Sequence, residues 1–207
     1  MPALKPFRAA GLAALAFLFT FAAGAARPAA TRPLPARPPL GNPHARVKVY
    51  IFEDLECPDC ALWHKYLRST ILPRYGSRVA FYLRDYPLPQ HNWSYNAAVL
   101  ERFFAAHNSR LYFAWIDYCY DHQAEITPEN LMNRAAALAA PYGLTLDRLQ
   151  QAFSNERYFQ AVQKDQSLGN RIGIDHTPTI FLDRPGGAQV TTFAQFQQAL
   201  ARQLHAR

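Results

Sequence analysis

Two cysteines three positions apart, Cys57 and Cys60, are the residues of this chain whose types and spacing could do chemistry. Pro58 and Asp59 separate them, an apolar run at 47–52 precedes them, and an amphipathic stretch follows. This pattern predicts a strand-to-helix junction with the first thiol at the helix N-terminus. Unpaired backbone N–H groups and the helix dipole favour a thiolate there, and the second thiol is close enough for a disulfide. The pair therefore indicates a reversible redox couple.

The same spacing has two other interpretations. A CxxC pair can be half of a zinc site, which needs four nitrogen or sulfur ligands, or it can form a purely structural disulfide. The chain has three cysteines and seven histidines, so zinc would have to recruit Cys119 and a histidine. Cys119 lies in an apolar helical stretch, and we interpret it as an inert buried thiol or a spare thiol for regulation or intermolecular pairing. We expect neither a metal nor a cofactor.

The positive charge of the chain is concentrated near its N-terminus. The net charge is +7, but six of the 22 basic residues and none of the 15 acidic residues precede Val47. The remaining body is nearly neutral, so it offers no electrostatic surface for nucleic acid.

Residues 1–26 have the organisation of a secretory signal peptide. Lys5 and Arg8 precede an apolar stretch, and small residues at 23–25 suit a cleavage site. An uncleaved membrane anchor is the alternative, because the apolar run is about long enough to span a bilayer. In either case we expect the body to be exported to the periplasm or another extracytoplasmic space, where disulfides persist.

The next segment, residues 27–46, contains six prolines. Proline breaks helices and strand ladders and favours an extended polyproline conformation. This composition predicts a Pro-rich linker, followed by a single domain over residues 47–207.

The domain alternates strand and helix patterns. Apolar runs predict strands at 47–54, 79–83, 177–183 and, after a turn at 184–187, at 188–190. The first helix is expected to run from Ala61 to about Leu72 and to end at Pro73 and Gly76. Its predicted buried stripe is Leu62, Tyr66, Leu67 and Ile71, with Trp63 near the same face.

Residues 92–170 are helical by pattern and contain no convincing strand. The first two helices are expected at about 94–107 and 111–121. A third is predicted to start at Thr127 as N-cap with Pro128 in the first position, and a fourth at Thr145. A capping box of Thr192 and Gln195 predicts a final helix that buries Phe193, Phe196 and Leu200.

Three motifs in this order resemble the DsbA-like branch of thiol:disulfide oxidoreductases. They are residues 52–60 (FEDLECPDC), 84–91 (RDYPLPQH) and 176–181 (HTPTIF). The resemblance covers nearly the whole body of the chain. It implies an α/β thioredoxin fold with a helical insertion subdomain at about 92–170.

The resemblance also implies a function and further site residues. The function is disulfide formation or reduction in cysteine-containing proteins by exchange through Cys57 and Cys60. A membrane redox partner that reoxidises the pair is implied as well, and we expect a monomer. Thr177 would offer backbone groups to a bound peptide, and Pro178 would be a cis proline beside the thiols. His176 departs from the small residue expected there, and it either stabilises the thiolate or is a surface loop histidine.

Two questions stay open at this level. A non-catalytic thioredoxin-fold binding or chaperone module with a structural CxxC disulfide is the alternative function. The direction of exchange depends on how far the thiolate of Cys57 is stabilised. Nearby acids oppose it, and strongly oxidising relatives carry a histidine in place of Asp59, so we expect a milder oxidant. The other acids of this group are Glu53, Asp54 and Glu56.

Overall fold

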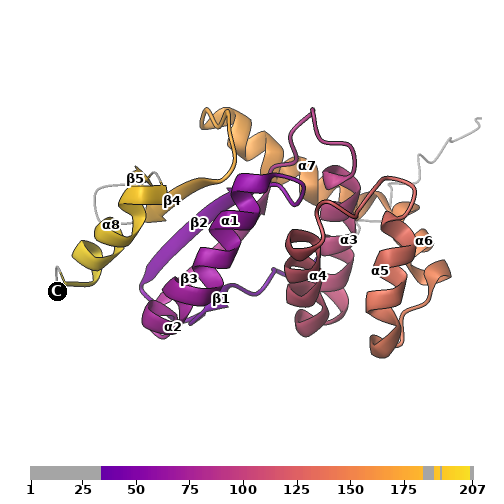
Figure 1. The fold of residues 1–207 in the computed structure, drawn as a ribbon, viewed down its shortest axis with the longest axis horizontal. Helices are drawn as coiled ribbons and strands as arrows, with labels where there is room; N and C mark the ends of the chain where they lie inside the picture. The colour runs from indigo at the N-terminus through magenta and orange to yellow at the C-terminus, as the bar shows by residue number, and fades with distance from the viewer. Residues whose placement is uncertain (1–33, 184–188, 192, 206–207) are drawn as a thin grey trace, which may run out of the picture. The chain divides into compact units, whose positions relative to one another are not determined.

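The computed structural model describes residues 34–183, 189–191 and 193–205. Within these residues a five-stranded sheet has the order β1-β3-β2-β4-β5 (Figure 1). The central strand β2 is parallel to its neighbour β3, and every other neighbouring pair is antiparallel. The strands are β1 (Leu40–Gly41), β2 (Val47–Glu53), β3 (Val79–Asp85), β4 (Thr179–Asp183) and β5 (Gln189–Thr191).

The helices fall into a group around the sheet and a group inserted between β3 and β4. A π-helical segment, Leu67–Ile71, joins α1 (Pro58–Tyr66) to α2 (Leu72–Tyr75), and α8 (Phe193–His205) closes the described chain. The inserted helices are α3 (Ser94–His107), α4 (Ser109–Asp121), α5 (Leu131–Ala139) with a 3-10 turn at Ala140–Tyr142, α6 (Leu146–Phe153) and α7 (Glu156–Arg171).

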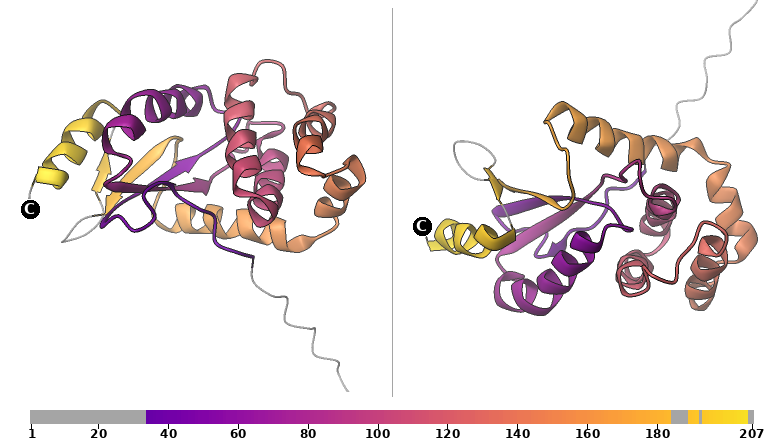
Figure 2. Two further views of the ribbon diagram at one scale, coloured as in Figure 1. Left: turned by 90° about the horizontal axis from the view of Figure 1, so that it is seen from below. Right: turned by 45° about the horizontal axis from the view of Figure 1, so that its top comes forward.

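Helices cover both faces of the sheet (Figure 2). On one face the ring of Trp63 in α1 meets that of Phe196 in α8 edge-on, with centroids 5.0 Å apart. On the other face Phe52, Tyr86 and Ile174 form a second buried cluster, which Leu168 of α7 also contacts. The predicted α/β thioredoxin fold with a helical insertion is confirmed.

The first helix differs from its prediction in two ways. Leu62 is 65% exposed, because the buried stripe runs instead through Cys60, Trp63, His64 and Leu67. The helix also passes Pro73 and ends only at Gly76. Just before Pro73, over Leu67–Ile71, the helix widens to a π-helical bonding pattern, in which the Leu72 N–H donates to the Leu67 carbonyl. A new α-helical segment, α2, begins after this widening. Pro73 lies in the first turn of α2, where a missing backbone N–H costs no intrahelical hydrogen bond.

The inserted helices match the predictions except at one start. The structure confirms α3, and Thr145 caps α6 by accepting from the Arg148 N–H. Regular helix in α5 begins at Leu131 rather than directly after Thr127. Residues 127–130 form a turn that leads into it, in which the Thr127 Oγ1 accepts from the Asn130 N–H and the Asn130 side chain accepts from the Thr127 N–H. The Leu131 N–H donates to the Thr127 carbonyl at 3.0 Å, so Thr127 has the capping role predicted for it.

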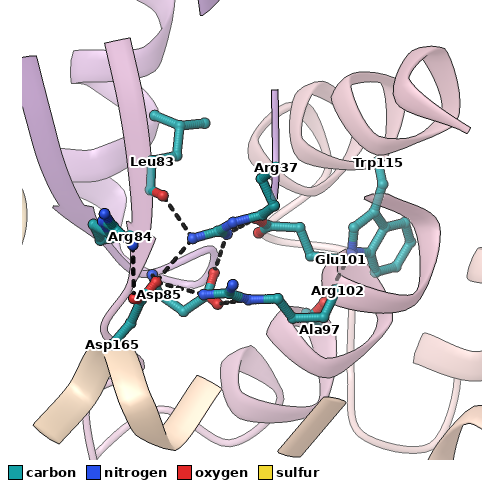
Figure 3. Close-up of polar contacts among 9 residues, drawn as sticks. All are labelled: Arg37, Leu83, Arg84, Asp85, Ala97, Glu101, Arg102, Trp115 and Asp165. Atoms are coloured by element: carbon teal, nitrogen blue, oxygen red, sulfur yellow. Dashed lines mark hydrogen bonds and ion pairs between the residues drawn. The ribbon is translucent and has the colours of Figure 1, made fainter. Parts of the chain in front are cut away.

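The linker prediction is wrong for residues 34–46. Leu40 and Gly41 form β1 against β3, and the buried guanidinium of Arg37 binds carboxylates from β3, α3 and α7 (Figure 3). Proline is compatible with edge strands and with extended segments, so a proline-rich composition did not exclude that residues 34–46 pack against the domain. We call residues 34–41 the N-terminal strap. The domain therefore begins before Val47.

Some predicted features lie outside the described residues. They are the segment 1–26, residues 27–33, the turn at 184–187 and the cap Thr192, together with the side chain of Phe193. The final strand is described at Gln189–Thr191, and Phe196 and Leu200 of the last helix are buried as expected. None of the helices in the described ranges has both the length and the apolar character needed to span a bilayer.

Candidate active site

The two cysteines sit where β2 gives way to α1. Cys57 is the N-cap of α1 with extended backbone angles, Pro58 follows in the first turn, and Cys60 lies within that turn. The Cys57 N–H donates to the Asp54 carbonyl at 3.1 Å, and its own carbonyl accepts from the Ala61 N–H. Neighbouring backbone therefore fixes both ends of the junction, and the predicted placement of the first thiol at a helix N-terminus is correct.

The two sulfurs have different surroundings. Cys60 is fully buried, and its Sγ accepts from the Asp54 N–H at 3.4 Å. Cys57 is 6% exposed, and in its protonated form its thiol donates to the Thr177 carbonyl at 3.4 Å. The Thr177–Pro178 peptide bond is cis, as the resemblance implied. The segment that leads into β4 therefore lies directly against the outer sulfur.

The surroundings shift the two thiols in opposite directions. The pKa of Cys57 is lowered to about 6, against the effect of burial. The largest cause is the hydrogen bond with Cys60, and the side chain of Thr177 and the backbone N–H groups of Asp59 and Cys60 contribute to the same lowering. Burial is the main cause that raises the pKa of Cys60 well above its usual value, and its bond with Cys57 adds to the rise. Near neutral pH the outer sulfur is thus a thiolate and the inner one a thiol.

The side chain of Asp54 stabilises the junction between β2 and α1. It is buried, and its Oδ1 accepts from the Glu56 N–H at 2.8 Å. Its Oδ2 accepts from the Leu88 N–H at 2.6 Å and lies 2.7 Å from Nδ1 of His91. One carboxylate therefore ties the turn before Cys57 to the proline-rich loop after β3. No sequence pattern signals this contact, because Asp54 and His91 lie 37 positions apart in the chain.

The inserted helices hold the junction from the side. Gln123, just after α4, donates from Nε2 to the carbonyls of Leu55 and Cys57 at 2.9 and 3.0 Å. Glu56 accepts from the Trp93 and Ser94 N–H groups at the start of α3. Neither role has a sequence signal, because each bond joins positions far apart in the chain. The carboxylate of Glu56 therefore lies at the N-terminus of α3, where a negative charge stabilises the helix.

The other predicted site residues, Pro58, Asp59 and His176, lie at the surface of the protein. Asp59 and Pro58 are exposed in the first turn of α1. The side chain of His176 is 70% exposed, and its Nδ1 lies 2.6 Å from the carboxylate of Asp175. The described contacts of His176 include neither sulfur, which favours its interpretation as a surface loop histidine.

Cys119 lies apart from this chemistry. It is buried in α4, and burial raises the pKa of its thiol well above the usual value. A thiol in that state is unreactive, which agrees with its interpretation as an inert buried residue. Across the part of the chain that the structure describes, no group of three or more His, Cys, Asp or Glu side chains is arranged to hold a metal.

Comparisons with known proteins agree with this architecture. The model of a family described as thioredoxin matches residues 35–202. No curated protein matches the sequence significantly.

Several solved structures share the fold. DsbA1 of Wolbachia pipientis is 21% identical with a TM-score of 0.67, and the match covers 83% of this chain and 92% of that one. BdbD of Bacillus subtilis is 18% identical with a TM-score of 0.70, covering 83% and 96%. DsbA2 of Pseudomonas aeruginosa is 20% identical with a TM-score of 0.63, covering 82% and 95%. The chain belongs to the thioredoxin family, and its fold is that of the DsbA-like proteins.

Proposed function

We propose that this protein is an exported thiol:disulfide oxidoreductase that forms or reduces disulfides in other proteins through Cys57 and Cys60. The observation that carries the proposal is the asymmetry of the two sulfurs. The outer thiol has a pKa of about 6, while the inner thiol is fully buried with a raised pKa. Family membership and the likeness to DsbA proteins support the same activity class.

In the oxidising direction, the protein starts with a Cys57–Cys60 disulfide. A substrate thiolate attacks the Cys57 sulfur, the sulfur–sulfur bond breaks, and Cys60 leaves as a thiolate that takes up a proton. A second substrate thiolate then attacks the substrate sulfur of the mixed disulfide. Cys57 departs as a thiolate, and its low pKa makes it a good leaving group. The substrate has lost two electrons and the protein has gained them.

In the reducing direction the same groups exchange roles. The Cys57 thiolate attacks a substrate disulfide and forms the mixed disulfide. Cys60, once deprotonated, attacks the Cys57 sulfur and releases the reduced substrate. The backbone of Thr177 lies against the Cys57 sulfur, so it is well placed to contact the substrate chain beside the reacting cysteine.

The setting of this chemistry is part of the proposal. The substrates are cysteine-containing proteins outside the cytoplasm, and a membrane redox partner restores the disulfide. The protein acts as a monomer and as a mild oxidant. The N-terminal composition supports export, whether or not the apolar segment is cleaved.

The direct test is oxidation of a reduced, unfolded protein whose activity depends on one disulfide. The oxidised protein is mixed with it stoichiometrically, and recovery of activity is followed. We expect Cys57→Ser to abolish recovery. The control Cys119→Ala should leave recovery unchanged, because that thiol is buried away from the couple. Equal recovery with and without the wild-type protein would instead favour a non-catalytic binding module.

A further inference from the structure

The strap residue Arg37 is the centre of a buried charge cluster (Figure 3). Its guanidinium pairs with Asp85 at 2.6 Å and with Asp165 at 2.9 Å, and it donates to the carboxyl group of Glu101. It also donates to the Leu83 carbonyl at 2.6 Å. Arg102 pairs with both aspartates, and Arg84 pairs with Asp165 at 3.1 Å. The cluster thus combines three guanidinium groups with three carboxyl groups.

The cluster reaches the redox couple through the sheet. Asp85 ends β3 directly opposite Glu53, which ends β2 in the parallel register. Glu53 is buried, and its Oε1 has no hydrogen-bond partner in the described chain. The next residue is Asp54, whose N–H donates to the Cys60 sulfur. Asp85, which pairs with Arg37, is therefore the strand neighbour of Glu53, and Glu53 directly precedes the residue whose N–H bonds the inner sulfur.

The charge states of these groups make Arg37 important. Burial, followed by the charge of Asp85, raises the pKa of Glu101 to about 8. Burial likewise raises the pKa of Glu53 well above its usual value. The pKa of Asp85 is lowered, because Arg102 and Arg37 outweigh its burial. At pH 7, Asp85 is thus the ionised acid nearest to Glu53 in the sheet, and Arg37 compensates its charge.

We propose that Arg37 is a positioning residue for the Cys57–Cys60 couple. By compensating the charge of Asp85 beneath the couple, it limits the negative potential at both sulfurs and so favours the reduced form with its Cys57 thiolate. This role rests on the proposed function of the couple. It makes the N-terminal strap part of the redox machinery rather than a tether.

The test compares Arg37→Gln, which removes the charge, with Arg37→Lys, which keeps it. Each purified full-length variant is equilibrated with glutathione buffers at pH 7, the disulfide fraction is measured by thiol trapping, and thermal unfolding is recorded. We expect Arg37→Gln to shift the equilibrium constant about threefold towards the disulfide. That is the effect of one charge acting over roughly 12 Å at an effective dielectric of about 40. Because Glu101 is already largely protonated at this pH, proton uptake there cannot offset the loss.

Arg37→Lys should leave the equilibrium within about 1.5-fold of wild type while lowering stability, because the forked hydrogen bonds are lost but the charge remains. A matched control is Arg68→Gln. Arg68, in the π-helical segment Leu67–Ile71, pairs with Asp117 of α4 at 3.0 Å, but it is 44% exposed, so its loss should leave the equilibrium unchanged.

A variant that removes a negative charge instead of a positive one keeps the test decisive if Arg37→Gln does not fold. Asp165→Asn removes a negative charge from the same cluster and should shift the equilibrium towards the dithiol. The proposal is overturned if stability falls while the equilibrium stays fixed, if Arg37→Lys shifts it as far as Arg37→Gln, or if Asp165→Asn shifts it the same way. These readouts need no substrate protein. A wild type that oxidises no protein would therefore refute the proposed function without affecting the result for Arg37.

Discussion

The sulfur of Cys57 lies 3.4 Å from the carbonyl oxygen of Thr177, although 120 residues separate the two in the chain. This contact joins the N-terminus of α1 to the residue two positions before β4. The backbone that leads into β4 therefore lies against one side of the Cys57 sulfur.

The acidity of Cys57 gives a first prediction. Its pKa of about 6 means that the thiolate fraction rises with pH through that value. We expect alkylation of the reduced protein by iodoacetamide to reach half its limiting rate near pH 6, with peptide mapping placing the label on Cys57. Cys60 and Cys119 should stay unlabelled in the folded protein at neutral pH. A half-maximal rate near pH 8.5, the ordinary value for a thiol, would contradict this account.

Exposed Asp59 gives a second prediction, which bears on the strength of the oxidant. Replacing it with histidine removes a negative charge from the first turn of α1. We expect Asp59→His to favour the Cys57 thiolate over the thiol roughly five- to tenfold, for a charge about 7 Å away at an effective dielectric of about 40. The thiolate absorbance is measured against pH. Asp147→His is the matched control, since Asp147 is also exposed in the first turn of a helix. An unchanged Cys57 pKa in Asp59→His would mean that solvent screens the acid fully.

Asp54 gives a third prediction, on stability. Asparagine in its place keeps the shape but loses the charge that binds two backbone N–H groups and His91. We expect Asp54→Asn to lower the free energy of unfolding in urea by about 2–4 kcal/mol, since buried bonds to a charged acceptor are lost. Asp183→Asn, at an exposed position of β4, should change it by less than about 0.5 kcal/mol. Equal effects of the two substitutions would refute the supporting role of Asp54.

Gly169 gives a fourth prediction, in which two effects oppose each other. Alanine is the better helix former by about 1 kcal/mol. However, a Cβ at this position of α7 would lie 2.5 Å from Cε2 of Tyr86. The Tyr86 ring cannot easily move away, because its hydroxyl oxygen lies within hydrogen-bond distance of two partners, the Ile174 carbonyl at 2.8 Å and the Asn170 side-chain oxygen at 2.6 Å. We therefore expect Gly169→Ala to destabilise the protein by about 1–3 kcal/mol in urea.

The control for that substitution is Ser167→Ala, at an exposed position of the same helix. It should change stability by less than about 0.5 kcal/mol. A stabilised Gly169→Ala variant would show that helix propensity outweighs the close approach of α7 to Tyr86.

Local patterns predicted much of this fold. The bounds of α3, the cap at Thr145 and the helix N-terminus at Cys57 follow from short stretches whose neighbours decide their conformation. The same reasoning failed for Leu62, because a helical stripe can be drawn through either Leu62 or His64 when both have apolar neighbours. Packing against α4, where His64 lies 2.6 Å from Asp117, selects the second.

Contacts across long sequence separations could not be predicted in this way. Arg37 binds Asp85 and Asp165, which lie 48 and 128 positions later in the chain, and proline-rich surroundings concealed its role. The positions of its acidic partners in the sequence did carry a signal. Asp85 ends an apolar strand and Glu101 interrupts an apolar helix, and acids in such places need a buried cation. The sequence does not say which arginine supplies it.

The central proposal is that Cys57 and Cys60 exchange disulfides with other proteins and that the pair acts as a mild oxidant. The most direct measurement equilibrates the wild-type protein with glutathione buffers and determines the disulfide fraction by thiol trapping. The account predicts a reduction potential above about −200 mV, the glutathione poise of an oxidising compartment, so that the pair can pass its disulfide on. A potential below about −300 mV would mark a structural bridge or a reductant, and it would contradict the account.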